Sequence, residues 1–261
     1  LNKPEEFWKS ISEDVFWFKK PNKILNKSKP PFYKWFEDGV TNSCYNAVDL
    51  HVNEGKGEKT AIIYDSPITG NKVKVTYNEL KEKVSKFAGA LDNQGIKKGD
   101  RVIIYMPMIP EAVVAMLACG RIGAIHSVVF GGFASNELAS RIDDSKAKIL
   151  ITASCGFEPG RTVEYRPLVD GALKLAKHKV DKVIFFQRKD HEINLNKPLE
   201  ISWEEALVNS KDKDCVEMGS NEFAYILYTS GTTGIPKGIV RDIGGHIVAL
   251  KWTMKNIYNI D

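Results

Sequence analysis

The feature that most constrains this chain is an alternation of short apolar runs with longer amphipathic segments. Apolar runs of strand length that alternate with helix-length segments are typical of a parallel sheet covered by helices on both faces. The predicted strands are 101–105, 124–129, 148–152, 182–187 and 223–227, and the predicted helices between and after them are 110–122, 135–144, 163–177 and 245–258. The sequence therefore predicts an α/β fold with a mostly parallel sheet.

The first hundred residues predict a cap and a hairpin in front of that sheet. Apolar residues recur at helical spacing over 4–18 and again over 44–52, with an aromatic, proline-punctuated arm between them. We therefore expect residues 1–56 to form a helical N-terminal cap. Two strands, 60–64 and 72–77, follow as a hairpin, and Thr76 with Glu79 forms a capping box that opens a helix reaching Gly95.

Composition excludes several classes of function. The net charge of +4 comes from 37 basic and 33 acidic residues spread along the chain, so neither nucleic acid nor a membrane surface is a predicted partner. The longest apolar run, Ala112–Gly120, is short for a membrane span. The four cysteines lack metal-ligand spacing, so we expect no metal site and reduced thiols inside a cell, in the mitochondrial matrix or the cytoplasm. The oligomeric state cannot be derived.

The stretch 228–238 is a predicted phosphate cradle. Its glycines allow successive backbone N–H groups to point toward one anion, and its hydroxyls and lysine can bind phosphate oxygens. A generic cluster of this kind between a strand and a helix is often only a turn. The spacing excludes a Walker loop, because Pro236 and Gly238 stand where a glycine and a Ser or Thr are required. The residues predicted to bind phosphate are Thr229, Ser230, Gly231, Thr232, Thr233, Gly234 and Lys237.

Two other loops follow predicted strands in the same way. Ligands of open α/β sheets bind beyond the carboxyl ends of the strands. The sequence Phe130-Gly131-Gly132-Phe133 follows one strand, and Glu158-Pro159-Gly160-Arg161 lies in the loop after the next. Three loops of this type predict one elongated site along one edge of the sheet.

These motifs resemble a known family. Residues 229–238 (TSGTTGIPKG) resemble the signature loop of the adenylate-forming superfamily, which includes acyl-CoA synthetases. Residues 99–111 and 121–133 are similar to the body of acetyl- and propionyl-CoA synthetases, and 241–252 looks more like the propionyl branch. The resemblance covers the whole chain.

The resemblance implies an ATP-dependent ligase that joins acetate or propionate to coenzyme A through an acyl-adenylate. It implies ATP, Mg²⁺ and coenzyme A as ligands, with the cradle on the β- and γ-phosphates of ATP. It places Phe130, Gly131 and Gly132 beside the adenine end of coenzyme A, and Gly160 and Arg161, next to Pro159, against its phosphates. Glu158 departs from the pattern, because the acetyl enzymes have arginine there.

The resemblance also implies that residues 57–261 are only the first part of an AMP-binding domain. The acyl pocket, the magnesium-binding glutamate and the adenylation lysine come later in the family, so no catalytic residue is assigned here and we expect the chain alone to be inactive. A non-catalytic nucleotide-binding or interaction module derived from that enzyme is the alternative. His51, His126 and His246 receive no role, and Asp143 with Asp144 is expected to be a solvated acidic pair.

Overall fold

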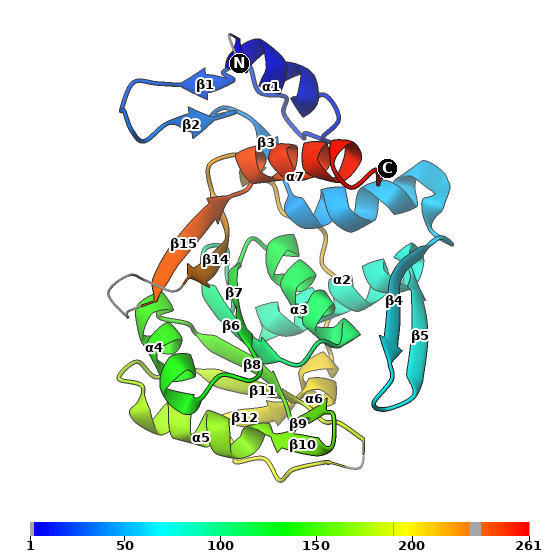
Figure 1. Cartoon of the computed structure of the whole chain (residues 1–261), viewed down its shortest axis with the longest axis vertical. Coiled ribbons are helices and arrows are strands. Elements are labelled where there is room, and N and C mark those ends of the chain that lie inside the picture. Colours follow the sequence, from blue (N-terminus) through cyan, green and yellow to red (C-terminus); the bar gives the residue numbers. More distant parts are fainter. Residues whose placement is uncertain (1–2, 190, 230–235, 261) are drawn as a thin grey trace.

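A seven-stranded sheet forms the centre of the computed structural model, which describes residues 3–189, 191–229 and 236–260 (Figure 1). The strand order is β12-β11-β8-β6-β7-β14-β15, and all neighbours in this part of the chain are parallel except β14 and β15. The strands are β6 (Arg101–Met106), β7 (Ile125–Phe130), β8 (Ile149–Ala153), β11 (Lys182–Phe186), β12 (Glu200–Ser202), β14 (Phe223–Thr229) and β15 (Lys237–Asp242). The predicted α/β fold with a mostly parallel sheet is confirmed.

Helices cover both faces of this sheet. The chain passes from β6 to β7 and then crosses back over β6 to β8, so right-handed connections place the two intervening helices on opposite faces. On one side α2 (Tyr77–Asn93) contacts both α3 (Pro110–Arg121) and α6 (Trp203–Leu207). On the other, α4 (Ser135–Ser145) packs against α5 (Tyr165–Leu175).

Local features of the sequence explain a central strand and the start of a helix. Val102 to Tyr105 of β6 are fully buried, as expected for a central strand with helices on both faces. The Thr76 hydroxyl accepts a hydrogen bond from the Glu79 N–H at 3.2 Å, and the Glu79 carboxylate accepts one from the Thr76 N–H at 2.8 Å. The predicted capping box at the start of α2 is confirmed.

A cap of short elements packs at one end of the sheet (Figure 1). Its elements are α1 (Pro4–Ser12), β1 (Leu25–Asn26), β2 (Lys34–Trp35), β3 (Val40–Thr41), and the π-helical turns η1 (Tyr45–Asp49) and η2 (Val52–Lys56). The last helix, α7 (Gly244–Asn256), packs on α1 through edge-to-face contacts of Trp252 with Phe7 and Trp8. β3 pairs with β13 (Met218–Gly219), which ties the cap to the segment before β14.

The predicted helix over 4–18 was wrong beyond Ser12. The chain turns there, and the Trp17 indole N–H donates to the Ser12 carbonyl at 2.9 Å. The hairpin of β4 (Thr60–Ser66) and β5 (Asn71–Thr76) is confirmed, with Gly70 at a φ of 69°. No helix in the described ranges is both long and apolar enough to cross a bilayer.

Several short elements escaped the prediction. They are β9 (Cys155–Glu158), β10 (Arg161–Glu164), β12, α6 and β15. The helix predicted over 163–177 overlaps the end of β10, and the stretch from Lys237 that forms β15 was expected to belong to a connection between a strand and a helix. Most residues of β10 and β15 are exposed, so neither strand has the alternation of buried and exposed positions that identifies a strand in a sequence.

A buried ion pair connects the cap to the α/β body. The Arg121 guanidinium, at the end of α3, donates to both carboxylate oxygens of Asp49 in η1, at 2.6 and 3.0 Å. Arg121 is 1% exposed, and its Nε donates to the Lys213 carbonyl. Desolvation opposes the charge on Asp49, but the hydrogen bonds and charge of Arg121 outweigh it and keep the pKa of Asp49 below its usual value.

We expect Asp49→Ala to lower the free energy of unfolding by about 3–5 kcal/mol, because it leaves the buried Arg121 cation uncompensated. Urea unfolding measures the change. Asp65→Ala is the matched control, since Asp65 pairs with Lys72 on the exposed β4–β5 hairpin and its loss should change stability little. Equal effects of the two substitutions would contradict the role assigned to the buried pair.

Candidate functional site

The strands that lead into the predicted loops end at one edge of the main sheet. β7 and β14 run parallel, with His126 paired to Tyr225, so Phe130 and Thr229 both mark carboxyl ends of strands on the same side. β8 is parallel to β6 and β11, and its carboxyl end leads directly into the β9–β10 hairpin. The carboxyl ends of β7, β8 and β14 therefore lie at one edge of the sheet, which is where open α/β sheets bind ligands.

The centre of the predicted phosphate cradle, Ser230, Gly231, Thr232, Thr233 and Gly234, lies outside the described residues. Its described flanks are Thr229 and Lys237, which pair as the last and first residues of β14 and β15. Both are exposed. The cradle thus joins two antiparallel strands and not a strand and a helix, which corrects the prediction.

A contact with α4 holds the start of this hairpin. The Tyr228 hydroxyl donates to the Asp144 carboxylate at 2.6 Å, and the Arg141 guanidinium lies 5.2 Å from the centre of the Tyr228 ring. Burial, followed by the hydrogen bond to Asp144, raises the pKa of Tyr228, so the phenol stays neutral and remains a donor. Asp143 and Asp144 were expected to be a solvated pair, and Asp144 is exposed; the half-buried Asp143 also accepts a hydrogen bond from the His178 N–H at 2.7 Å. Both residues anchor other segments.

The Phe130–Phe133 loop presents an aromatic ring to solvent. Phe130 is 66% exposed, and its ring meets that of Phe133 edge to face at 5.7 Å. The Phe133 N–H donates to the Phe130 carbonyl at 3.0 Å, which closes the turn around the two glycines. An exposed aromatic face beside a tight glycine turn can stack against a flat heterocycle such as a nucleobase.

The β9–β10 hairpin carries the other predicted residues at its tip. Gly160 has a φ of 74°, which a Pro-Gly turn requires. The Arg161 Nε donates to the Glu158 carboxylate at 2.7 Å, and the two side chains are 71% and 40% exposed. The single arginine is therefore already paired with the glutamate that stands where the acetyl enzymes have a second arginine.

Tyr165 connects the two loops and was missed by sequence reasoning. A Cβ placed on Gly131 would lie 2.0 Å from the Tyr165 hydroxyl oxygen, and one placed on Gly156 would lie 2.9 Å from it. Tyr105 packs on the Tyr165 ring and donates from its own hydroxyl to the Phe133 carbonyl at 2.7 Å. Burial raises the pKa of Tyr105 to about 12, so this hydroxyl stays protonated. No local pattern marked either tyrosine.

An apolar cavity of about 480 Å³ lies between the cap, α3 and α7. It is lined by His126, Tyr225 and His246, and the Tyr225 hydroxyl shares a hydrogen bond with His246 Nε2 at 2.8 Å. Within the described part of the chain, His126 Nδ1 has no hydrogen-bond partner and no contact with solvent. His126 lies in β7, as predicted, and its environment is that of a packed neutral histidine.

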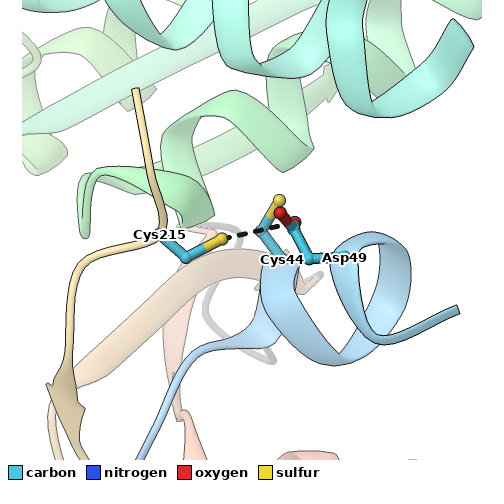
Figure 2. A group of neighbouring side chains, drawn as sticks. All are labelled: Cys44, Asp49 and Cys215. Atoms are coloured by element: carbon cyan, nitrogen blue, oxygen red, sulfur yellow. Dashed lines mark hydrogen bonds between the residues drawn. The ribbon is translucent and has the colours of Figure 1, made fainter. Parts of the chain in front are cut away.

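The described ranges contain one cluster of potential metal ligands. One group of three, Cys44, Asp49 and Cys215, has its donor atoms within 4.8 Å of one another (Figure 2). The Arg121 guanidinium contacts all three side chains. A cation already occupies the position that a metal would need, so these residues do not fit a metal ion.

Comparisons with known proteins agree with the observed fold. The sequence model described as AMP-binding enzyme matches residues 50–260, and the one described as acetyl-coenzyme A synthetase N-terminus matches residues 1–47. The chain is similar to the acyl-CoA synthetase short-chain family member 3, mitochondrial, of Rattus norvegicus, with 52% identity over 258 residues, and to the acetyl-coenzyme A synthetase of Streptomyces avermitilis, with 43% over 255. These alignments cover 98% and 97% of this chain but only 38% and 39% of the relatives.

A solved structure shares the architecture. The acetoacetyl-CoA synthetase from Streptomyces lividans superposes with a TM-score of 0.89 at 24% identity, and the match covers 100% of this chain and 40% of that one. At this identity the likeness shows the fold alone.

We expect Gly131→Ala to lower the free energy of unfolding by about 1–3 kcal/mol, because the new methyl group collides with the Tyr165 hydroxyl. The double variant Gly131→Ala/Tyr165→Phe should recover part of the loss, since it removes the nearest atom. Gly132→Ala is the control, because the atoms nearest to its Cβ would belong to the exposed Phe130 ring, which can move. Urea unfolding of the four chains measures this, and no recovery in the double variant would refute the contact.

We also expect acid to destabilise the protein through His126. Burial lowers its pKa to about 4 from an ordinary value of 6.5. Between these values the unfolded chain binds a proton that the folded chain does not, so stability present above pH 6.5 is lost as the pH falls toward 4. The loss should reach about 3 kcal/mol, at about 1.36 kcal/mol for each pKa unit.

His126→Gln should remove this part of the acid sensitivity. Urea unfolding at pH 8, 7, 5.5 and 4.5 measures it, with the interval from pH 8 to 7 as the internal control in which the difference between wild type and variant stays constant. A constant difference down to pH 4.5 would contradict the prediction.

Proposed function

The chain belongs to the AMP-binding enzyme family, and on that premise we propose that it is the N-terminal part of an ATP-dependent short-chain acyl-CoA ligase. Such an enzyme converts a short-chain carboxylate, ATP and coenzyme A into acyl-CoA, AMP and diphosphate through an acyl-adenylate. The chain spans about 38% of the length of the curated relatives that it matches, so the activity proposed is that of the longer protein. The cap over 1–56 and the AMP-binding part over 57–261 are the proposed domains.

One observation supports the proposal above all: Thr229, the Phe130–Phe133 loop and the β9–β10 hairpin stand at the carboxyl ends of three parallel strands of the same sheet. Thr229 and Lys237 stand in register across the hairpin mouth, both exposed. A loop closed by that pair can present backbone N–H groups and the Lys237 ammonium to the β- and γ-phosphates of ATP. Ser230, Gly231, Thr232, Thr233 and Gly234 complete the proposed phosphate site.

The coenzyme A site is proposed at the loops joined by Tyr165. The exposed Phe130 ring and the Gly131-Gly132 turn would receive the adenine, and the tip formed by Glu158, Pro159, Gly160 and Arg161 would face the phosphates. Because Glu158 accepts hydrogen bonds from Arg161, a phosphate must compete with a carboxylate for this guanidinium. We therefore expect weaker phosphate binding than at a tip with two arginines.

The proposed reaction requires charge stabilisation, but no general base, from this part of the protein. A carboxylate is ionised at neutral pH, so it attacks the α-phosphorus without a general base. Its repulsion from the triphosphate must be reduced, and charge must be stabilised as diphosphate leaves; Lys237 and the backbone N–H groups of the cradle are placed to do this. The thiol of coenzyme A then displaces AMP from the acyl-adenylate. Cysteine chemistry of the protein is not required.

Magnesium is part of the proposal only as a ligand of ATP. When bound, it would neutralise phosphate charge. The carboxylate beside the cradle flank, Asp144, already accepts a hydrogen bond from Tyr228. No step is assigned to the metal on this chain.

The favoured branch is an enzyme that prefers propionate, because residues 241–252 resemble that branch. The proposed location is the mitochondrial matrix or the cytoplasm. The name of the rat relative accords with a mitochondrial location, and free cysteines accord with either compartment.

The proposal predicts two separable binding defects. Lys237→Ala should weaken ATP binding about tenfold and leave coenzyme A binding unchanged, and Arg161→Ala should do the reverse, because each removes one charged phosphate contact. Isothermal titration of each ligand measures both affinities. Lys72→Ala on the distant β4–β5 hairpin is the control. If neither ligand binds, or if both variants weaken both ligands equally, the assignment fails.

ATP–diphosphate exchange with acetate or propionate distinguishes the ligase from the alternative module. We expect no exchange by this chain alone and exchange once it is joined to the remaining portion of a family member. Exchange by the chain alone would overturn the expectation that adenylation needs the later segments. Binding without exchange in the completed enzyme would favour a non-catalytic nucleotide-binding module.

A further inference from the structure

Two cysteines from distant parts of the chain, one in the cap and one outside it, lie close together (Figure 2). Cys44 lies at the start of η1, and Cys215 lies in the irregular segment 208–217, which we call the strap. Their Sγ atoms and a carboxylate oxygen of Asp49 all lie within 4.8 Å of one another. Cys44 is fully buried, whereas Cys215 is partly exposed to solvent.

A fixed cation lies against both sulfur atoms. Arg121 Nη1 is 3.6 Å from Cys44 Sγ and 3.3 Å from Cys215 Sγ. The Cys215 thiol also donates to Asp49 at 3.5 Å. A guanidinium at this distance stabilises a thiolate, which is the reactive form of cysteine.

The backbone on both sides of Cys215 is anchored to the same arginine. The Val216 N–H donates to the Arg121 carbonyl at 2.9 Å, and Arg121 Nε donates to the Lys213 carbonyl. The Lys213 N–H in turn donates to the Ser85 carbonyl of α2 at 3.2 Å. These bonds hold the strap so that the Cys215 side chain faces Cys44.

The two thiols differ in how readily each loses its proton. A hydrogen bond from Cys215, reinforced by Arg121, lowers the pKa of Cys44 despite its burial. The same contact and burial raise the pKa of Cys215. The pair therefore loses its first proton more readily than an isolated buried thiol does, and the resulting charge lies on Cys44.

We propose that Cys44 and Cys215 form a reversible disulfide by exchange with a small-molecule disulfide such as oxidised glutathione. Cys215 is the entry point because it is the member that solvent reaches. Cys215 passes its proton to the neighbouring Cys44 thiolate, and the Cys215 thiolate formed in this way attacks one sulfur of the reagent to give a mixed disulfide, while the other half of the reagent leaves as a thiolate that takes the proton from Cys44. The Cys44 thiolate then attacks Cys215 Sγ, and the second half of the reagent leaves.

The step balances as a two-electron exchange. The two protein thiols are oxidised to one disulfide, and the reagent disulfide is reduced to two thiols that take up the two protons. The sulfur atoms must approach from within 4.8 Å to about 2.05 Å, which requires rotation of both side chains and a small shift of the strap. The product ties η1 of the cap to the strap across a closed loop of the chain, which restricts the unfolded state.

The other two cysteines serve as controls in the same molecule. Cys119 is fully buried, and burial raises its pKa to about 12. Cys155 is 1% exposed, and burial raises its pKa as well. Both should stay reduced under conditions that oxidise the pair.

The test treats the folded chain with oxidised glutathione, blocks remaining thiols with iodoacetamide after unfolding, and maps the peptides by mass spectrometry. We expect a peptide pair joined through Cys44 and Cys215, with Cys119 and Cys155 alkylated. Dithiothreitol should reverse the link. Thermal unfolding should occur at a higher temperature for the oxidised chain than for the reduced one.

Variants separate the two steps. Cys215→Ser should abolish glutathione uptake and the thermal shift, and Cys44→Ser should stop the reaction at a mixed disulfide on Cys215. If Cys44→Ser does not fold, the peptide map of the wild type and Cys215→Ser still decide. A mixed disulfide that persists on Cys215 in the wild type, or full alkylation of both cysteines, would overturn the proposal.

Discussion

The interaction on which the structure most depends is the buried ion pair of Arg121 and Asp49. A guanidinium that is 1% exposed cannot remain charged without compensation, and the compensation comes from parts of the chain far apart in sequence. The carboxylate comes from the cap, and a carbonyl and a sulfur come from the strap. The Arg121 guanidinium therefore holds the cap, the strap and the end of α3 together. The same guanidinium stabilises a thiolate in the cysteine pair beside it.

The proposed ligand edge depends on a second kind of constraint, which is steric. Tyr165 fills the space that side chains at Gly131 and Gly156 would need, so the aromatic loop and the β9–β10 hairpin approach the same ring. This arrangement brings an exposed aromatic and an arginine to one edge of the sheet. The partner of that arginine, Glu158, moderates its charge. This edge offers an aromatic ring for stacking and a guanidinium with limited attraction for phosphate, and the exposed Lys237 lies farther along it on β15.

The prediction from sequence succeeded where the signal was local and periodic. The central strands were placed because each is a continuous apolar run, the helices because apolar residues recur at helical spacing, and the capping box of α2 because Thr76 and Glu79 stand three residues apart. It failed for β10 and β15, which are short and mostly exposed and therefore carry no such repeat. It gave no sign that Asp143 and Asp144 each accept a hydrogen bond from a distant segment. The cradle and the coenzyme A residues stay predictions about ligands.

By itself, the sequence determined the fold class and the positions of the three loops in the order of the strands, because strand and helix periods are properties of neighbouring residues. Its motifs also determined the family. Three contacts were decided only by the tertiary structure. Asp49 neutralises the charge of Arg121, Tyr165 packs against both Gly131 and Gly156, and Cys44 faces Cys215. These contacts join residues that no spacing rule relates, since burial, charge and close packing are satisfied in space and leave no repeat along the chain.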